Sequence, residues 1–387
     1  MALRFAGQPL EASTVLRDGT HRAATLDATW RRFSPAMRRA GITRIAELTG
    51  LDTLGIPVFA AIRPMGRSLS TQQGKGLTPD AARVSALMES LETWTAEHVA
   101  LPTVRGSWRT LRDRAIDVRR LARPRKRLEL GATWKWVEGR DLATDAPVLV
   151  PLEAVTLDTV FGKPPVFDVS SNGLASGNVL VEAIVHGLCE VIERDAEAAW
   201  RRAGGDRRLV LDSIDDRACR ALIEQIASTG ARVFVWDLGG DTGVPAIGCA
   251  IMEDPREPAW RTLGFYQGFG AHLLPEIAIA RALTEAAQTR LTYIAGGRDD
   301  FFAFDYAKAT DPVLLAELWD QLAAPTEEPA LFDDLPRLDH RGLGDALEQL
   351  VARVGSVIAV DLTHPELGVP VVKVIVPGRA TDVEAMG

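Results

Sequence analysis

Glutamates at helical spacing are the residues of this sequence best suited to chemistry. The segment 178–200 is apolar around most of its circumference when it is drawn as a helix, yet it contains Glu182, Glu190 and Glu193. At about 100° per residue, Glu190 lies roughly 80° and Glu193 roughly 20° from Glu182, so the three carboxylates share one stripe of a buried helix. Because buried carboxylates without a cation are costly or become protonated, this stripe predicts a bound divalent metal.

Two more predicted helices carry similar residues. Ser85, Glu89 and Glu92 lie at i, i+4 and i+7 of one helix, and Glu285 and Gln288 belong to the other. Oxygen ligands without histidine or cysteine suit Mg²⁺ better than zinc or copper, and Mg²⁺ suits a nucleoside triphosphate because it bridges phosphate oxygens to carboxylates. For any one helix alone, a solvent-exposed acidic face is the commoner explanation. Three such helices together favour a magnesium site.

Polar or glycine-rich turns are predicted before two of these helices. One turn spans 72–76 and contains Lys75, and the other spans 170–177 and contains Asn172. Such turns leave backbone N–H groups free near a helix start, where they can hold an anion, and Lys75 adds a mobile positive charge for a phosphate. The first turn is not a Walker A motif, because the spacing and the following Ser or Thr are missing.

The elements that position these residues are predicted to be a mixture of helices and strands. Several neighbouring strands are joined by short turns rather than by helical crossovers, which favours an α+β fold with antiparallel sheets. With no internal repeat and no linker in the sequence, we expect one continuous unit. Helices are predicted at 79–98, 180–200, 214–228, 275–294 and 343–354, and strands at 57–62, 133–138, 148–151, 232–237, 245–252, 357–362 and 371–376.

Composition excludes several classes of protein. The 387 residues are 47% hydrophobic and 25% charged, as in an ordinary folded domain. No apolar stretch of about eighteen residues and no signal peptide occur, so we expect a cytoplasmic protein without a membrane segment. The net charge of −8 argues against a nucleic-acid binder. Cys189, Cys219 and Cys249 lack metal-ligand spacing and are interpreted as small buried hydrophobic residues.

One basic segment, residues 105–127, departs from the acidic composition. It could contact an acidic partner or peptide. The simpler interpretation is a solvated arginine-rich helix that ends before Pro124. His186, on the acidic stripe, could carry a proton, although a buried histidine hydrogen-bonded to a carboxylate is the more common case.

Together, these motifs resemble the YcaO family. The resemblance runs from about residue 55 to Pro377-Gly378, so residues 1–54 are expected to be an N-terminal extension packed on a YcaO domain of residues 55–387. The matching motifs are Gly-Lys-Gly at 74–76, Ser-x-x-x-Glu-x-x-Glu at 85–92, Ser-Asn-Gly-Leu-Ala-Ser-Gly at 171–177, Glu-Ala-Ile-x-His-Gly-Leu-x-Glu-x-Ile-Glu-Arg-Asp at 182–195, Glu-x-x-Gln at 285–288 and Pro-Val-Val-Lys-Val-Ile-Val-Pro-Gly at 370–378.

The resemblance implies antiparallel sheets and packed helices around an ATP and Mg²⁺ site. Members of the family phosphorylate a backbone amide oxygen of a peptide; a side-chain nucleophile then gives an azoline, sulfide a thioamide and an amine an amidine. By position, the implied metal ligands are Glu89, Glu92, Glu190, Glu193 and Glu285. The implied ATP contacts are Lys75, Ser85, Glu89, Asn172, Glu182, Arg194 and Gln288. Of these, Arg194 and Lys75 are expected to neutralise charge on the transferring phosphoryl group.

Two departures from the family pattern affect this expectation. Thr93 stands where the family often has Arg after the second Glu of the first motif, which puts a phosphate or structural contact there in doubt. The C-terminus, 379–387, lacks the proline-rich tail of many azoline-forming members. This difference favours thioamide formation in a ribosomally made peptide or protein. With no fused leader-binding or adenylating domain, we expect a separate, TfuA-like partner, and a homodimer is possible. The alternatives are an azoline-forming cyclodehydratase and a non-catalytic ATP-binding scaffold subunit.

Overall fold

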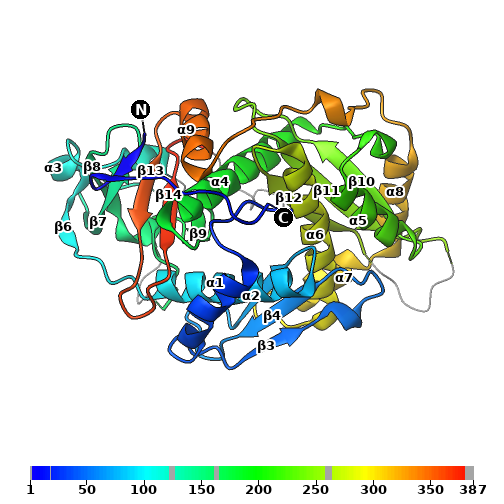
Figure 1. Cartoon of the computed structure of the whole chain (residues 1–387), viewed down its shortest axis with the longest axis horizontal. Helices are drawn as coiled ribbons and strands as arrows, with labels where there is room; N and C mark the ends of the chain where they lie inside the picture. Colours follow the sequence, from blue (N-terminus) through cyan, green and yellow to red (C-terminus); the bar gives the residue numbers. More distant parts are fainter. Residues whose placement is uncertain (1, 18, 122–126, 161–164, 258–263, 380–387) are drawn as a thin grey trace.

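The computed structural model describes residues 2–17, 19–121, 127–160, 165–257 and 264–379 (Figure 1). The helices are α1 (Leu26–Phe33), α2 (Pro79–Glu97), α3 (Trp108–Leu111), α4 (Leu180–Ala203), α5 (Arg217–Ala227), α6 (Pro275–Ala295), α7 (Ala303–Ala309), α8 (Pro312–Ala323) and α9 (Leu343–Val354). Within the described ranges, none of them combines the length and the apolar character that a membrane span needs.

Among the described residues, the strands form three sheets and a small hairpin, and every pairing between these strands is antiparallel. The hairpin joins β1 (Arg4–Phe5) and β2 (Gln8–Pro9). The first sheet has the order β3 (Arg44–Glu47), β4 (Val58–Ile62), β5 (Thr71–Lys75). The second has the order β6 (Val104–Ser107), β7 (Thr133–Asp141), β13 (Ile358–Asp361), β14 (Val371–Ile375), β9 (Leu174–Ser176), with β8 (Pro147–Pro151) also on β7. The third has the order β10 (Arg232–Asp237), β11 (Ala246–Met252), β12 (Tyr266–Ala271).

Each sheet ends in a strand that leads directly into a long helix. These strand–helix units are β5–α2, β9–α4 and β12–α6. Each helix packs on its own sheet, and each also contacts the last strand of another unit: α2 contacts β9, α4 contacts β12 and α6 contacts β5. Figure 1 shows the result, with α4 and α6 across the middle of the molecule and α2 beneath them. The three helices therefore surround a common centre.

Small residues allow two of these helices to lie very close to their strands. A Cβ atom on Gly74 of β5 would come within 2.0 Å of the backbone nitrogen of Ala86 in α2. A Cβ atom on Gly268 of β12 would come within 2.2 Å of the same atom of Ala286 in α6. The helices begin with Pro79 and Pro275, whose missing N–H group costs nothing in a first turn. Close packing against glycine therefore fixes the height of each helix above its sheet.

The α+β class with antiparallel sheets is confirmed, and the long helices and most predicted strands lie where the apolar patterns place them. The helix predicted at 343–354 and the strand predicted at 232–237 have those bounds in the structure. Three local predictions are wrong. Residues 174–176, predicted as part of the 170–177 turn, form the buried strand β9, which pairs with β14. Residues 72–75, predicted as part of the 72–76 turn, belong to the buried strand β5, where the hydroxyls of Ser90 and Thr292 donate to the amide oxygens of Gln72 and Gln73. The basic segment is not one helix: it contains β6, α3 and a 3₁₀ turn (Val118–Arg120), and residues 122–126 lie outside the described ranges.

Candidate active site

The three long helices present polar side chains from equivalent positions. Counted from the first residue of α2, α4 and α6, the side chains ten positions further on are Glu89, Glu190 and Glu285, and those thirteen positions further on are Glu92, Glu193 and Gln288. The fold therefore repeats one arrangement three times, although the sequence between these positions shows no repeat. This threefold arrangement can be recognised in the sequence: the motifs Glu-x-x-Glu, Glu-x-x-Glu and Glu-x-x-Gln begin at the same distance from the starts of the three helices.

The strand of each unit contacts the helix of another unit in the same way. The contacting residues stand four positions before each helix and are Lys75, Ser176 and Ala271. Lys75 forms an ion pair with Glu285, and Ser176 hydrogen-bonds Glu92. The backbone N–H of Ala271 donates to Glu193 Oε2 at 3.0 Å. The structure thus brings together carboxylates that are almost two hundred residues apart in the sequence.

Three of these carboxylates, Glu89, Glu92 and Glu190, form no ion pair with another described residue. Loss of hydration raises the pKa of Glu89 to about 7, although Lys75 and Arg298 act in the opposite direction. Burial likewise raises the pKa of Glu190 to about 7. Burial and the charges of Glu89 and Glu190 raise the pKa of Glu92 well above its ordinary value.

Glu89 also exposes much of its side chain to solvent. A side chain that is exposed to solvent but has lost much of its hydration typically lines a concave surface that water can reach. Glu89 therefore lines a space that water can enter, and none of Glu89, Glu92 and Glu190 has an ion-pair partner among the described residues.

The other two carboxylates, Glu193 and Glu285, are compensated by protein cations. Burial alone would raise the pKa of Glu285, but Lys75 and Arg194 outweigh it and lower the pKa to about 2. Burial and the charge of Glu285 raise the pKa of Glu193, against the attraction of Arg194 and Arg281. Arg194 lies 3.8 Å from Glu193 and 3.9 Å from Glu285, and Arg281 lies 3.5 Å from Glu193. Both arginines remain charged at any physiological pH.

Glu182, which the sequence placed on the same stripe, lies apart from the carboxylates of the centre. It is two helical turns away from Glu190, and its oxygens accept hydrogen bonds from the backbone N–H of Ala23 at 2.8 Å and from Asn178 Nδ2 at 3.2 Å. Arg22 lies 3.6 Å away. Glu182 therefore anchors the N-terminal segment to α4, and it borders a cavity rather than the centre.

This cavity has a volume of about 20 Å³ and lies between α4, α6 and the N-terminal segment. Its walls include Glu182, His186, Arg281 and His21. His186 Nε2 lies 3.1 Å from Arg281 Nη1 and must accept, because a guanidinium only donates. Burial, with Arg22 and Arg281, lowers the pKa of His186 well below its ordinary range. His186 is therefore neutral, which argues against its role as a proton carrier.

The remaining predicted contacts lie around the same centre. Ser85 is half-buried one turn before Glu89 on α2. Gln288 Nε2 donates to the backbone carbonyl of Gln73 at 2.8 Å. Asn172 has a buried Oδ1 without a partner among the described residues, although its backbone N–H donates to Ser170 Oγ at 3.1 Å. An unsatisfied buried acceptor is rare in a folded protein and is expected where a ligand binds.

Several charged residues near the carboxylates were not among the predicted site residues. Arg281 of α6 reaches Glu193, and the charge of Arg298 acts on Glu89. Lys373 of β14 is 5% exposed, and the charges of Glu190 and Glu92 act on it. Burial lowers the pKa of Lys373 to about 8. Arg281 stands six positions into α6, where α2 has Ser85 and α4 has His186, so the constant helix spacing was a signal for it. Lys373 lies in the motif at 370–378 that contributed to the family resemblance, but no spacing in the sequence relates it to the carboxylates, and none marks Arg298.

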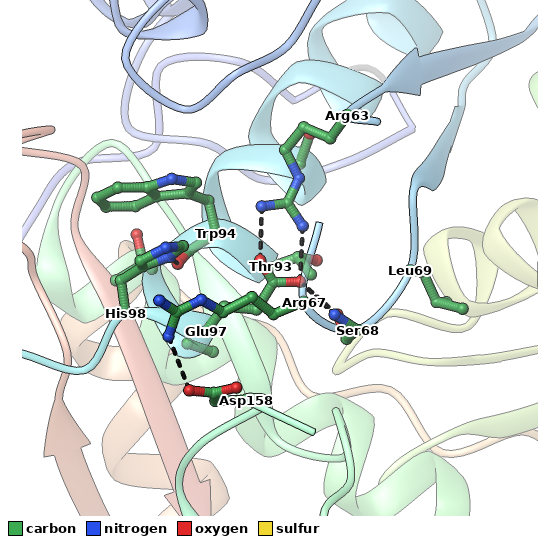
Figure 2. Close-up of polar contacts among 12 residues, drawn as sticks. Arg63, Arg67, Ser68, Leu69, Thr93, Trp94, Glu97, His98 and Asp158 are labelled. Atoms are coloured by element: carbon green, nitrogen blue, oxygen red, sulfur yellow. Dashed lines mark hydrogen bonds and ion pairs between the residues drawn. The ribbon is translucent and has the colours of Figure 1, made fainter. Parts of the chain in front are cut away.

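The end of α2 carries a different carboxylate, Glu97, which is fully satisfied (Figure 2). Arg63 donates to its two oxygens at 2.7 and 2.8 Å, and the backbone N–H and hydroxyl of Ser68 donate at 2.8 and 2.6 Å. Figure 2 shows Thr93 beside this pair, one turn earlier on α2. The Thr93 hydroxyl donates to the carbonyl of Glu89, so this residue contacts its own helix. The guanidinium on this face of α2 comes from Arg63 of the β4–β5 hairpin.

The donor set fits Mg²⁺ held together with phosphates. Within the described ranges, no three His, Cys, Asp or Glu side chains converge closely enough to hold one metal ion by themselves. Magnesium commonly takes one or two carboxylates and completes its shell with water and phosphate oxygens. Glu89, Glu92 and Glu190 are carboxylates without an ion-pair partner among the described residues, which is the type of ligand Mg²⁺ takes, and Lys75 and Arg194 are cations suited to phosphate. The assignment of individual residues to metal or nucleotide stays a prediction.

A chain with this fold and these carboxylate-bearing helices belongs to the YcaO family. The family model, described as a YcaO cyclodehydratase that binds ATP and Mg²⁺, matches residues 73–380. The chain is 36% identical over 398 residues to an uncharacterized protein in the tfuA 3′ region of Rhizobium leguminosarum bv. trifolii, covering 98% of this chain and 93% of that protein.

Two solved structures extend the comparison. The YcaO protein of Methanopyrus kandleri, bound with AMPPCP and Mg²⁺, is 30% identical and covers 96% of both chains with a TM-score of 0.77. A heterocyclase in complex with substrate and cofactor is 22% identical with a TM-score of 0.80. The match covers 98% of this chain and 54% of that heterocyclase, so it shows a shared fold.

Proposed function

We propose that this protein uses ATP and Mg²⁺ to activate a backbone amide of a peptide or protein, so that sulfide can replace the amide oxygen. The observation that carries the proposal is the set of unpaired carboxylates, Glu89, Glu92 and Glu190, beside the cations Lys75 and Arg194. A site of this kind attracts divalent cations on one side and phosphates on the other. Membership of the YcaO family supports the same assignment.

In this proposal the side chains of the protein position and neutralise charge. Glu89, Glu92 and Glu190 hold Mg²⁺, and Glu193 and Glu285 orient Arg194 and Lys75 through the contacts described above. Bound ATP supplies the phosphoryl group that turns the amide oxygen into a leaving group. Arg194 and Lys75 stabilise negative charge as that group is transferred, which is the main contribution a protein makes to phosphoryl transfer. No side chain of the protein needs to act as the nucleophile.

Thioamide formation is the preferred outcome among the alternatives. The relative from Rhizobium leguminosarum lies in a tfuA 3′ region, which supports a TfuA-like partner and a role in sulfur transfer. An azoline-forming cyclodehydratase is the second candidate, because a heterocyclase shares the fold. The C-terminal residues 380–387, whose sequence weakened the azoline hypothesis, lie outside the described ranges.

Nucleotide binding measured by calorimetry tests the site itself. AMPPCP is titrated into the protein with and without Mg²⁺, into Glu190→Gln, and into Glu224→Gln as a control, since Glu224 is an exposed residue of α5. Magnesium-dependent binding that only Glu190→Gln loses is the expected result. Equal binding by all three proteins would refute the carboxylate site. Absence of binding by every protein would refute the site as it stands and favour one completed by a partner.

Mass spectrometry of the host distinguishes the reactions. Small proteins and peptides of cells with the wild-type gene are compared with those of cells carrying Glu190→Gln. A mass gain equal to the exchange of oxygen for sulfur, present only with the wild type, is expected for thioamide formation. Loss of one water would instead identify azoline formation. A non-catalytic scaffold would leave these masses dependent on the protein but unchanged by Glu190→Gln.

A further inference from the structure

Lys373 is a buried lysine that the proposed reaction does not use. It lies on β14, is 5% exposed, and donates from Nζ to the backbone carbonyl of Ser170. The charges of Glu190, Asp168 and Glu92 all act on it. A buried ammonium is costly unless it is compensated, so its place beside two carboxylates of the centre needs an explanation.

The same strand holds the polar loop that precedes α4. Lys373 bonds Ser170 at the start of this loop, and the backbone N–H of Val374 donates to the carbonyl of Gly173 at 2.7 Å. Ser170 Oγ in turn accepts a hydrogen bond from the backbone N–H of Asn172, whose Oδ1 is buried without a partner among the described residues. Lys373 is therefore connected both to the loop that presents Asn172 and to the carboxylates of α2 and α4.

Packing alone does not require a lysine at this position. Lys373 lies opposite Leu174, six positions before the start of α4. In the other two units the residues six positions before the helix lie opposite Ala60 of β4 and Gly248 of β11. Both of these residues are buried, so the fold accommodates small, uncharged residues at the equivalent place. The lysine is specific to the unit that carries the polar loop.

We propose that Lys373 is a positioning residue of the nucleotide site, which fixes the 170–173 loop and disfavours Mg²⁺ at Glu92 and Glu190 until a nucleotide is present. The inference rests on the proposed function, because it assumes that these carboxylates hold Mg²⁺ with a nucleotide. Its physical basis is the sign of one buried charge. A fixed positive charge repels a bare cation and attracts phosphate, and both effects are strong where water is scarce.

Replacement of Lys373 by methionine provides the test, because it removes the charge while it keeps an unbranched side chain. Burial lowers the pKa of Lys373, so the folded protein holds this ammonium at a cost in free energy that removal of the charge relieves. We therefore expect the melting temperature of Lys373→Met without ligands to be no lower than that of the wild type. AMPPCP with Mg²⁺ should bind about ten- to a hundredfold more weakly, as is typical when a supporting residue of a metal site is lost. Mg²⁺ alone should bind more tightly.

If Lys373→Met binds Mg²⁺ alone more tightly and AMPPCP with Mg²⁺ more weakly than the wild type, the lysine has a positioning role and not a purely structural one. A structural lysine would weaken both ligands and lower the melting temperature. Lys373→Arg, which keeps the charge, should restore most of the nucleotide affinity, and Lys135→Met, at an exposed lysine of β7 in the same sheet, should behave as the wild type. If Lys373→Met binds both ligands as the wild type does, the inference is wrong. If the wild type itself binds no nucleotide, the proposed function fails first.

Discussion

Helix α2 carries two kinds of carboxylate that differ in their partners. At its end, Glu97 is 1% exposed and accepts hydrogen bonds from Arg63 and Ser68, which outweigh burial and lower its pKa. In its middle, Glu89 and Glu92 form no ion pair with another described residue, and burial raises the pKa of both. The same residue type on the same helix is therefore stabilising in one place and costly in the other.

The difference indicates which region is structural and which is functional. Arg63 and Ser68 belong to the β4–β5 hairpin, so their bonds to Glu97 fasten that hairpin to α2. The same hairpin leads through β5 to Lys75, which pairs with Glu285 of α6. A fully satisfied carboxylate thus holds in place the elements that surround the carboxylates without an ion-pair partner. Buried carboxylates without a paired cation persist where a ligand provides the missing partner.

Loss of Glu97 should have the largest effect on stability. Glu97→Leu leaves the Arg63 guanidinium buried without its partner, so we expect the free energy of unfolding to fall by about 3–5 kcal/mol. Urea denaturation followed by circular dichroism measures this change. The double variant Arg63→Met with Glu97→Leu should regain much of the loss, because no unpaired charge remains. A loss below about 1 kcal/mol in the single variant would contradict a structural role for this pair.

Substitution in the middle of α2 should weaken nucleotide binding without lowering the stability of the protein. Glu89→Gln removes a carboxylate that lies near Glu285 and Glu92, so the protein without ligands should be as stable as the wild type or more stable. Binding of AMPPCP with Mg²⁺ should weaken at least tenfold, about 1.4 kcal/mol, because a metal ligand is lost. Calorimetry and thermal denaturation of the same sample measure both effects. Unchanged nucleotide binding would place Glu89 outside the metal site.

The raised pKa values predict how ligand binding depends on pH. Glu89 and Glu190 have pKa values of about 7 in the folded protein, above those of an unfolded chain, so they stabilise the ligand-free fold at low pH. That contribution is lost as the pH rises through about 7. Mg²⁺ requires the ionised carboxylates, so the increase in melting temperature on addition of Mg²⁺ and AMPPCP should be larger at about pH 8 than at about pH 6. An increase that does not vary over this range would contradict the role of these carboxylates as ligands.

The sequence was informative where the cause of a structure is local. The 3.6-residue spacing of glutamates among apolar residues predicted α2, α4 and α6 and the acidic side chains they present. The polar residues 72–76 were interpreted as a turn, because glycine favours turns and these residues lack an apolar pattern. In the structure Gln72 accepts a hydrogen bond from Ser90 and Gln73 one from Thr292, so tertiary partners make a buried polar strand possible.

Residues that act across units could not be found from spacing along the chain. Glu97 belongs to the same helix as Glu89, but its contacts with Arg63 and Ser68, thirty-four and twenty-nine positions away, distinguish its role. Lys373 lies in an apolar strand, and its relation to Glu92 and Glu190 depends on the pairing of β14 with β9. Such contacts depend on how sheets and helices are assembled in three dimensions, and a single sequence contains no direct signal for them.

The smallest effect is expected from a second ion pair drawn in Figure 2, between Arg67 and Asp158. Its N–O distance of 2.8 Å is close to the 2.7 Å between Arg63 and Glu97, but the Arg67 side chain is 45% exposed. In water each charge keeps most of its hydration, so Arg67→Ala should lower the free energy of unfolding by about 0.2–1 kcal/mol and leave nucleotide binding unchanged. Urea denaturation of Arg67→Ala and Glu97→Leu under the same conditions compares the two losses of free energy of unfolding directly. A loss from Arg67→Ala as large as that from Glu97→Leu would show that distance, and not burial, determines what these pairs contribute.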